Sequence, residues 1–306
     1  MEPLRIGARA SMMSLMQTAP ILARLAPTPA ILHPFYGAGG DRVKNRAALE
    51  ADGVFSEEIE TALLAGEIDI AVHCLKDAPT HDTPGLTMAT YLRRDDISDC
   101  LVTREDGLTL DSLPAGATIA TASVRRTAAL RAYRPDLNVV PIRGPVDERL
   151  RALQDRNSGV DALIVATCSM ERIGLTHRIT ERISTEIICP PLGAAIIALQ
   201  TREGDMETRR AIFKLHDSDT EVQAEAERLI LRQMGGFCNA PLAGYCTTHR
   251  VGSGALTSYT VRACTFSADG GSMIDVRHSG DDAEEVAKTV CQELKRSADG
   301  KLVKRP

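Results

Sequence analysis

The chain has 306 residues, of which 43% are hydrophobic and 25% charged, and its formal net charge is −5. This composition is ordinary for a globular protein with one large domain or two to three small ones, and it excludes global disorder. The acidic balance argues against a general nucleic-acid binder, although a local basic cleft remains compatible with it.

The eight cysteines are irregularly spaced, and none forms a C-x-x-C pair. The pattern therefore predicts neither a zinc site nor a disulfide framework, and it fits reduced thiols in a cytoplasmic protein. We expect no signal peptide, because Ser and Gln interrupt the apolar residues near the N-terminus. No apolar run reaches the roughly 18 residues that a membrane span needs.

The first hundred residues alternate strand-like and helical patterns. In chain order we expect a strand at 5–7, a helix at 11–25, loop and edge strand at 26–53, a helix that begins after Ser56 and a buried strand at 68–73. Ser56 is a typical N-cap, and the two glutamates that follow it suit the positive end of a helix dipole. Pro79 stops regular structure soon after the buried strand.

From about residue 97 the pattern changes to repeated strand–loop–helix units. Strands are expected at 118–120, 138–142 and 161–166, with helical segments at 123–133, at 146–156 and from 169. Strands that alternate with helices indicate the α/β class with a parallel sheet. Ligands of such sheets bind at the carboxyl ends of the strands.

The last third of the chain predicts a small α+β unit. A helix at 221–234 ends at two glycines, antiparallel strands follow at 256–265 and 273–278, and a helix at 282–296 comes last. This unit is distinct from the α/β part, so we expect a separate small domain in the last third of the chain.

Basic residues fall at or just past the ends of the predicted strands. They are Arg9, Lys76, Arg125, Arg126, Arg143 and Arg172, with Arg149 one turn into a helix. Ser11, Ser123 and Ser169 add hydroxyl donors at similar places. Any one of these residues is more simply a solvated side chain, but their shared position predicts a cleft for a polycarboxylate or a phosphate.

Two further residues are candidates for chemistry. Asp77 stands beside Lys76 in a sharp turn, where a carboxylate can accept a hydrogen bond from a ligand N–H and stabilise a developing cation. Cys238 lies on a loop that follows a helix, and a loop thiol near cations can be a nucleophile. Taken alone, a turn-forming aspartate and a buried free thiol are the commoner explanations.

Taken together, these segments resemble the porphobilinogen deaminase (hydroxymethylbilane synthase) family over nearly the whole chain and in order. The matching stretches are RIGARAS at 5–11, AVHCLKDAP at 71–79, TASVRR at 121–126, RPDL at 134–137, RG at 143–144, RL at 149–150, RIGL at 172–175, PPLG at 190–193, ER at 227–228 and CNAP at 238–241. Each stretch alone is a weak signal, whereas their order and spacing together are specific.

The resemblance implies a fold of three domains. Two α/β domains would be similar to periplasmic binding proteins, the first formed by 1–92 plus 193–213 and the second by 98–188. The third would be a small α+β domain, 218–306, that carries Cys238. The chain would cross between the first two domains twice.

The resemblance also implies a transferase of tetrapyrrole (porphyrin and heme) biosynthesis. It would condense four porphobilinogen molecules, with loss of ammonia, into a linear tetrapyrrole on a dipyrromethane cofactor bound covalently to Cys238. Asp77 would be catalytic, stabilising the azafulvene cation and the later pyrrolium. The cofactor would be held by Lys76, Ser123, Arg125, Arg126 and Arg149, and the substrate by Arg9, Ser11, Arg143 and Arg172. No metal, nucleic acid or membrane partner is implied, and a cytoplasmic monomer is expected.

Several positions depart from the family pattern. They are the lid stretch 48–55, which lacks the usual lysine and glycines, and the single positions Pro145, Ala194 and Phe237. A divergent housekeeping enzyme is the favoured interpretation. A paralog in a specialised pathway, acting on a related pyrrole or chain length, is the second. A non-catalytic module that binds small anions is the third, although it would need neither Asp77 nor Cys238.

Overall fold

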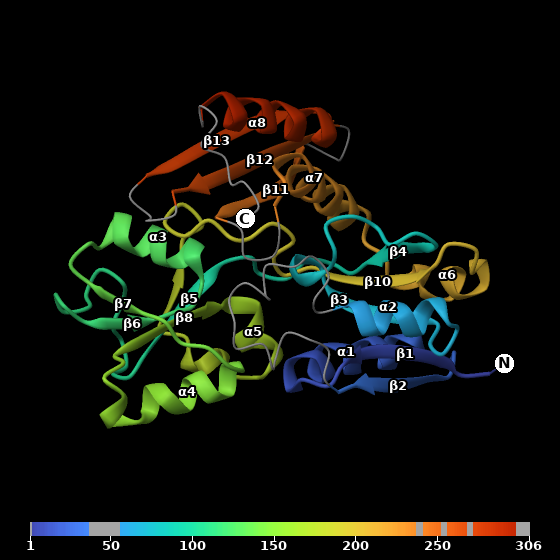
Figure 1. Ribbon diagram of the computed structural model, residues 1–306, viewed down its shortest axis with the longest axis horizontal. Coiled ribbons are helices and arrows are strands. Elements are labelled where there is room, and N and C mark those ends of the chain that lie inside the picture. The colour runs from blue at the N-terminus through green and yellow to red at the C-terminus, as the bar shows by residue number, and fades with distance from the viewer. Residues whose placement is uncertain (1, 37–55, 237–240, 252–255, 268–271, 298–306) are drawn as a thin grey trace.

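The computed structural model describes residues 2–36, 56–236, 241–251, 256–267 and 272–297. These residues form three sheets, each in its own lobe (Figure 1), so the expected three domains, two α/β and one small α+β, are confirmed. Within the described part of the chain, no helix is long and apolar enough to cross a membrane. The lid stretch 48–55, Phe237 and Cys238, for which the sequence makes predictions, lie outside the described residues.

The first sheet has the strand order β2-β1-β3-β10-β4. Its strands are β1 (Leu4–Arg9), β2 (Ala30–Phe35), β3 (Ile70–Cys74), β4 (Leu86–Tyr91) and β10 (Ile197–Arg202), and its helices are α1 (Met12–Leu25), α2 (Glu57–Leu64) and α6 (Met206–Ile212). Helix α1 buries residues three to four positions apart, including Gln17, Ile21 and Leu25, against the sheet. Its N-cap Ser11 accepts a hydrogen bond from the Ser14 backbone, as the serine at the predicted helix start suggested.

The second sheet has the strand order β7-β6-β8-β5-β9. Its strands are β5 (Asp99–Thr103), β6 (Thr118–Ala120), β7 (Asn138–Val140), β8 (Ala162–Ala166) and β9 (Glu181–Ile183), and its helices are α3 (Val124–Tyr133), α4 (Val146–Gln154) and α5 (Thr167–Arg172). Separate apolar clusters pack on the two faces of this sheet. The sheet is therefore buried on both sides, as is usual in the α/β class.

The third domain packs two helices against one sheet, β11-β12-β13. Its elements are α7 (Ser218–Met234), β11 (Leu242–Val251), β12 (Leu256–Phe266), β13 (Met273–Gly280) and α8 (Ala283–Ser297). Helix α8 buries Val286, Val290 and Leu294, a spacing of four that lays one apolar stripe on the strands. Short 3₁₀ turns complete the chain at Leu75–Asp77, Arg156–Ser158, Thr176–Arg178 and Phe213–Leu215.

The expectation of a purely parallel sheet is wrong in part. Strands β1, β2 and β3 pair in parallel, and so do β6, β7 and β8. However, β10 runs antiparallel to β3 and β4, and β5 runs antiparallel to β8 and β9. The reason is the connectivity, because the chain leaves the first sheet after β4 and returns to it as β10, entering each sheet from the opposite side.

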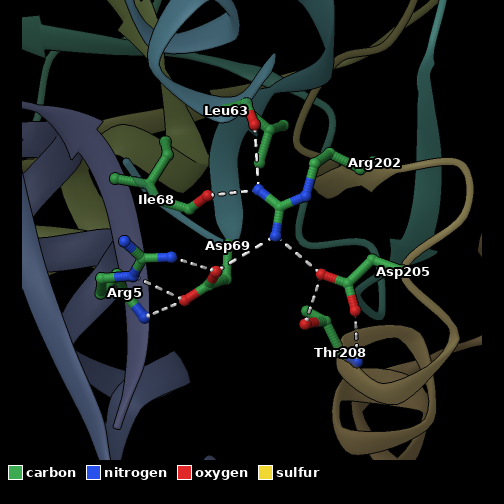
Figure 2. Close-up of polar contacts among 7 residues, drawn as sticks. All are labelled: Arg5, Leu63, Ile68, Asp69, Arg202, Asp205 and Thr208. Carbon is green, nitrogen blue, oxygen red and sulfur yellow. Dashed lines mark hydrogen bonds and ion pairs between the residues drawn. The ribbon is translucent and has the colours of Figure 1, made fainter. Parts of the chain in front are cut away.

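A network of charges fastens the returning strand β10 to the first domain (Figure 2). Asp69 accepts hydrogen bonds from the Arg5 guanidinium at 2.7 Å and from Arg202 at 3.1 Å. Arg202 also donates to the backbone oxygens of Leu63 and Ile68 and to Asp205, the N-cap of α6. The Asp69 carboxylate therefore links β1 to β10, whose Arg202 lies 133 residues after Asp69 in the chain.

A second ion pair, built on a buried carboxylate, ties the third domain to the two segments that cross between the α/β domains. Glu227 on α7 is 0% exposed and accepts hydrogen bonds from Arg94 at 2.6 Å. Its carboxylate also accepts from the backbone N–H groups of Gly193 and Cys246. Arg94 lies on the first crossing between the α/β domains, Gly193 lies on the second, and Cys246 is on β11. One side chain of the third domain is thus bonded to both crossing segments and to β11.

We expect Glu227→Ala to lower the free energy of unfolding by about 3–5 kcal/mol, because it leaves the buried Arg94 charge and two backbone donors without their acceptor. Urea denaturation measures the loss. Asp219→Ala is the matched control on the same helix, since Asp219 pairs with the exposed Arg250 and should matter far less. Equal losses in the two variants would contradict the central role of Glu227.

Asp69 yields a prediction about pH. Burial alone would raise the pKa of this carboxyl, but hydrogen bonds from Arg5 and Arg202 outweigh burial and lower the pKa below its ordinary value of 3.8. The stabilisation is therefore complete above that value and is lost as the pH falls below it. We expect Asp69→Asn to cost about 1–2 kcal/mol at neutral pH. The difference in unfolding free energy should shrink once the pH drops below 3.8, and a constant difference there would refute this account.

Candidate active site

A cavity of about 510 Å³ lies between the two α/β domains, where the parallel strands end. It brings together all the site residues expected from the sequence except Cys238, which is outside the described residues. They are Arg9, Ser11, Lys76, Asp77, Ser123, Arg125, Arg126, Arg143, Arg149 and Arg172, and Ser169 lines the cavity too. Their separate binding roles stay predictions, but their meeting in one cavity follows from the strand-end geometry.

The turn that holds Lys76 and Asp77 is braced by the second crossing segment. Gly193 has φ +75°, and a Cβ added to it would lie 2.9 Å from the Lys76 nitrogen. The Leu75 N–H donates to the Ile196 carbonyl at 2.9 Å. Glycine is therefore required at 193, both for the backbone conformation and for the close approach of the two segments. The Asp77 carboxylate stands on a fixed turn rather than on a free loop.

Two serines in the cavity wall begin helices. Ser11 caps α1, and the Ser123 hydroxyl accepts from the Arg126 backbone at the start of α3. Because a hydroxyl that accepts at a cap keeps its own O–H, each serine can still donate a hydrogen bond into the cavity. The helix N-termini behind them add backbone partial positive charge.

Asp99 is a buried carboxylate shared by two of the predicted cofactor ligands. It is 1% exposed and accepts from Arg125 at 2.8 Å and from Arg126 at 2.6 Å. Burial would raise the pKa of Asp99, but the two arginines lower it to about 2. Arg125 also donates to the Cys189 carbonyl, so it ties the second crossing segment to the wall of the second domain. The trio carries a net charge of +1 toward the cavity.

Arg149 is a cation of this wall that has no acidic partner among the described residues. It donates to the Gly144 carbonyl at 2.7 Å, and no ion pair is formed by it within the described part of the chain. Burial, followed by repulsion from Arg126 and Arg143, lowers the pKa of Arg149 to about 10. A group whose charged form is disfavoured in this way gains most from an anionic ligand.

Arg172 enters the cavity from the end of α5. Its Nε and Nη2 donate to one oxygen of Asp95, and its Nη1 lies 3.4 Å from Gln17 Oε1 on α1. The arginine thus spans both α/β domains and the first crossing segment. His73 also borders the cavity, but it bonds Gln200 at 2.9 Å, and burial lowers its pKa to about 4, so it stays neutral.

Sequence reasoning missed the two acidic partners, Asp95 and Asp99. The signal was present in the stretch RRDDISD at 93–99, where three aspartates follow two arginines at the start of a buried strand. Their arginine partners lie 26 to 77 residues further along the chain, beyond any local pattern. Pro145 is the N-cap of α4, so this helix begins at Val146, the start expected from the sequence.

Comparison with known proteins agrees with the sequence motifs and with the cationic cavity. Residues 4–210 match the family model "Porphobilinogen deaminase, dipyromethane cofactor binding domain". "Porphobilinogen deaminase 2" of Streptomyces coelicolor is 43% identical over 88% of this chain and 85% of its own length. "Porphobilinogen deaminase" of Deinococcus deserti is 38% identical over 93% and 92% of the two chains.

A solved periplasmic binding protein of Salmonella typhimurium also matches 74% of this chain and 97% of its own. Its identity is 11% and its TM-score 0.36, a likeness too low to bear on ligand or mechanism. The family model covers the two α/β domains that build the cavity, and the relatives extend over the third domain as well. The chain therefore belongs to the porphobilinogen deaminase family.

Proposed function

We propose that this chain is a hydroxymethylbilane synthase. It joins four porphobilinogen molecules into a linear tetrapyrrole, releasing ammonia at each condensation, on a dipyrromethane cofactor attached to Cys238. The observation that carries the proposal is the cavity itself, in which one aspartate on a braced turn faces a wall of arginines within a chain of this family.

The charge of the cavity suits a polycarboxylate cofactor. Arg149 has no acidic partner among the described residues, and the Asp99 trio leaves one positive charge uncompensated. Arginine forks match carboxylates bidentately, and they are strong where water is excluded. When bound, dipyrromethane supplies the growing end to which the pyrroles are joined. The residues proposed to hold it are Lys76, Ser123, Arg125, Arg126 and Arg149.

The substrate ligands in this proposal are Arg9, Ser11, Arg143 and Arg172. They come from β1 and α1 on one side of the cavity and from the β7–α4 loop and α5 on the other. Porphobilinogen carries two carboxylates, so ligands from both domains can hold one molecule across the crevice. Holding both carboxylates in this way would fix the ring relative to Asp77, which lines the same cavity.

Asp77 is proposed to stabilise the cation that remains when ammonia leaves the aminomethyl group of porphobilinogen. A carboxylate preorganised on a fixed turn costs little reorganisation when positive charge develops beside it. The surrounding arginines cannot serve in this role, because their charge has the same sign as the developing cation. In this proposal the arginines bind the carboxylates of the pyrroles, and Asp77 stabilises the positive charge on the ring.

The residues that flank Cys238 support its place in the proposal. Thr80, in the turn that follows Asp77, donates to the Gly236 carbonyl at 3.2 Å. Leu242, four residues after the cysteine, lines the cavity. The described chain before and after Cys238 thus approaches the Asp77 turn and the cavity.

The proposal extends to the domain boundaries and the state of the protein. The first domain would comprise 1–92 plus 193–213, the second 98–188 and the third 218–306, and the pairing of β10 with β3 and β4 supports the split first domain. We also propose a cytoplasmic monomer without a nucleic-acid partner, in keeping with the net charge of −5.

We expect Asp77→Ala and Asp77→Asn to lower kcat at least about a hundredfold, because the developing cation loses its only proposed counter-charge. Formation of hydroxymethylbilane from porphobilinogen measures turnover, and thermal unfolding checks the fold. Asp111→Asn is the control, since this acid bonds Tyr133 on the surface of the second domain. Turnover near the unmodified level in both Asp77 variants would remove Asp77 from the mechanism.

Cys238→Ser should abolish the covalent cofactor. Intact mass under denaturing conditions should show an excess of two condensed pyrrole units in the purified protein, or after incubation with porphobilinogen, and no excess in the variant. Cys74→Ser is the matched control, because Cys74 is another thiol that borders the cavity, and it should keep the excess. An unchanged adduct on Cys238→Ser would move the attachment to another residue.

A further inference from the structure

We propose that Asp95 is an internal competitor for the substrate carboxylate at Arg172. In the structure the guanidinium of Arg172 is hydrogen-bonded to the Asp95 carboxylate. A carboxylate of the incoming pyrrole would take the place of Asp95 on that guanidinium. Asp95 would thereby set the affinity for substrate without touching the reacting ring. This inference rests on the proposed function, since it assigns a specificity role at the same site.

The geometry at Arg172 is that of a bound carboxylate. Arg172 Nε lies 2.9 Å and Nη2 2.7 Å from Asp95 Oδ2, so the two donors on one edge of the guanidinium share a single carboxylate oxygen. The Arg172 side chain is 13% exposed and lines the cavity. An arginine edge that already holds one carboxylate can hold another of the same shape, because both present planar oxygens to the same fork.

The two acid partners of the cavity arginines differ in how firmly they are held. Asp99 is 1% exposed and bonded by two arginines, so removing it from them would strand a buried charge. The Asp95 side chain is 46% exposed and bonded by Arg172 through one oxygen only. A carboxylate already half in water loses little when it turns fully into solvent. Asp95 is therefore the partner that can exchange.

Arg172 and the crossing segment have other contacts that would remain after the exchange. Arg172 keeps the Ala195 carbonyl at 3.3 Å and Gln17 at 3.4 Å. The Asp95 backbone N–H donates to the same Ala195 carbonyl at 3.2 Å and does not depend on the side chain. Exchange of the carboxylate thus leaves both the arginine and the segment in position.

The KM of the Asp95→Asn variant for porphobilinogen should change in opposite directions depending on whether Asp95 competes with the substrate or supports Arg172 structurally. If the aspartate competes, its neutral isostere holds Arg172 less tightly, and the KM for porphobilinogen falls about two- to fivefold. If the aspartate instead positions Arg172, the KM rises. The substituted amide is nearly isosteric and leaves the backbone hydrogen bond intact, so thermal unfolding should change little.

Asp96→Asn is the matched control. Asp96 is the next residue, and it pairs with Arg182, which is not among the cavity residues. Both variants remove one negative charge from the same segment, so a general change in the electrostatic field would affect them alike. We expect the KM to fall in Asp95→Asn and to stay unchanged in Asp96→Asn. A KM that is unchanged or raised in Asp95→Asn, or lowered equally in both variants, would overturn the proposal.

Two further measurements separate this inference from the proposed function. In an Arg172→Gln background, Asp95→Asn should no longer improve binding, and an improvement that persists there would overturn the role of Arg172. Binding of succinate at constant ionic strength, followed by thermal shift, should tighten in Asp95→Asn by a similar factor. Binding of succinate does not depend on turnover, so it tests whether Asp95 competes for Arg172 even in a protein that does not convert porphobilinogen. Failure to convert porphobilinogen would refute the proposed function and leave this inference standing.

Discussion

The buried carboxylate of Glu227 is the interaction on which the rest of the molecule depends. It accepts from Arg94 and Gly193 on the two crossing segments and from Cys246 on β11. The next residue on the helix, Arg228, donates to the Pro79 carbonyl in the turn after Asp77. Two neighbouring side chains of α7 thus fix the hinge between the α/β domains and the turn that carries the proposed catalytic group.

The arginines of the cavity differ in how firmly each is paired with an acidic side chain. Asp99 is buried between Arg125 and Arg126 and behaves as part of the framework, with a pKa lowered to about 2. Arg149 has only a backbone acceptor among the described residues, so it offers a standing site for an anion. Arg172 holds an exchangeable carboxylate. A covalently attached cofactor needs a permanent cation, whereas a substrate that binds and dissociates needs a cation with an exchangeable partner. In the proposed function Arg149 suits the first requirement and Arg172 the second.

The sequence predicted the long amphipathic elements well and the pairing of strands poorly. Helices α1, α3, α7 and α8 were found as helical stretches of ten or more residues, with a serine at the start of α1 and α3 and two glycines after α7 as terminal signals. Strands β4, β5, β9, β10 and β11 were missed, since short apolar runs without clear turns carry little local signal. The antiparallel course of β5 and β10 was missed as well, because it follows from where the chain crosses between domains.

The sequence predicted which basic residues line the cavity, but it did not predict their acidic partners. Placing basic residues at the ends of parallel strands was enough to gather Arg9, Lys76, Arg126 and Arg143 around one cavity. Their acidic partners were not foreseen, because an ion pair such as Arg172–Asp95 joins residues 77 positions apart. Local pattern can say which side chains face a crevice, whereas only the packed structure says which of them are already engaged.

Ala195, which lines the cavity, adopts a backbone conformation that residues with a Cβ rarely take. This alanine has φ +61°, a left-handed conformation that costs a residue with a Cβ about 1 kcal/mol or more. Its carbonyl accepts from the Asp95 backbone and from Arg172. The conformation aims that carbonyl at both groups, so the strain is offset by contacts that hold the crossing segment and the arginine together. The backbone requirement at 195 therefore comes from the same carboxylate site that Asp95 and Arg172 form.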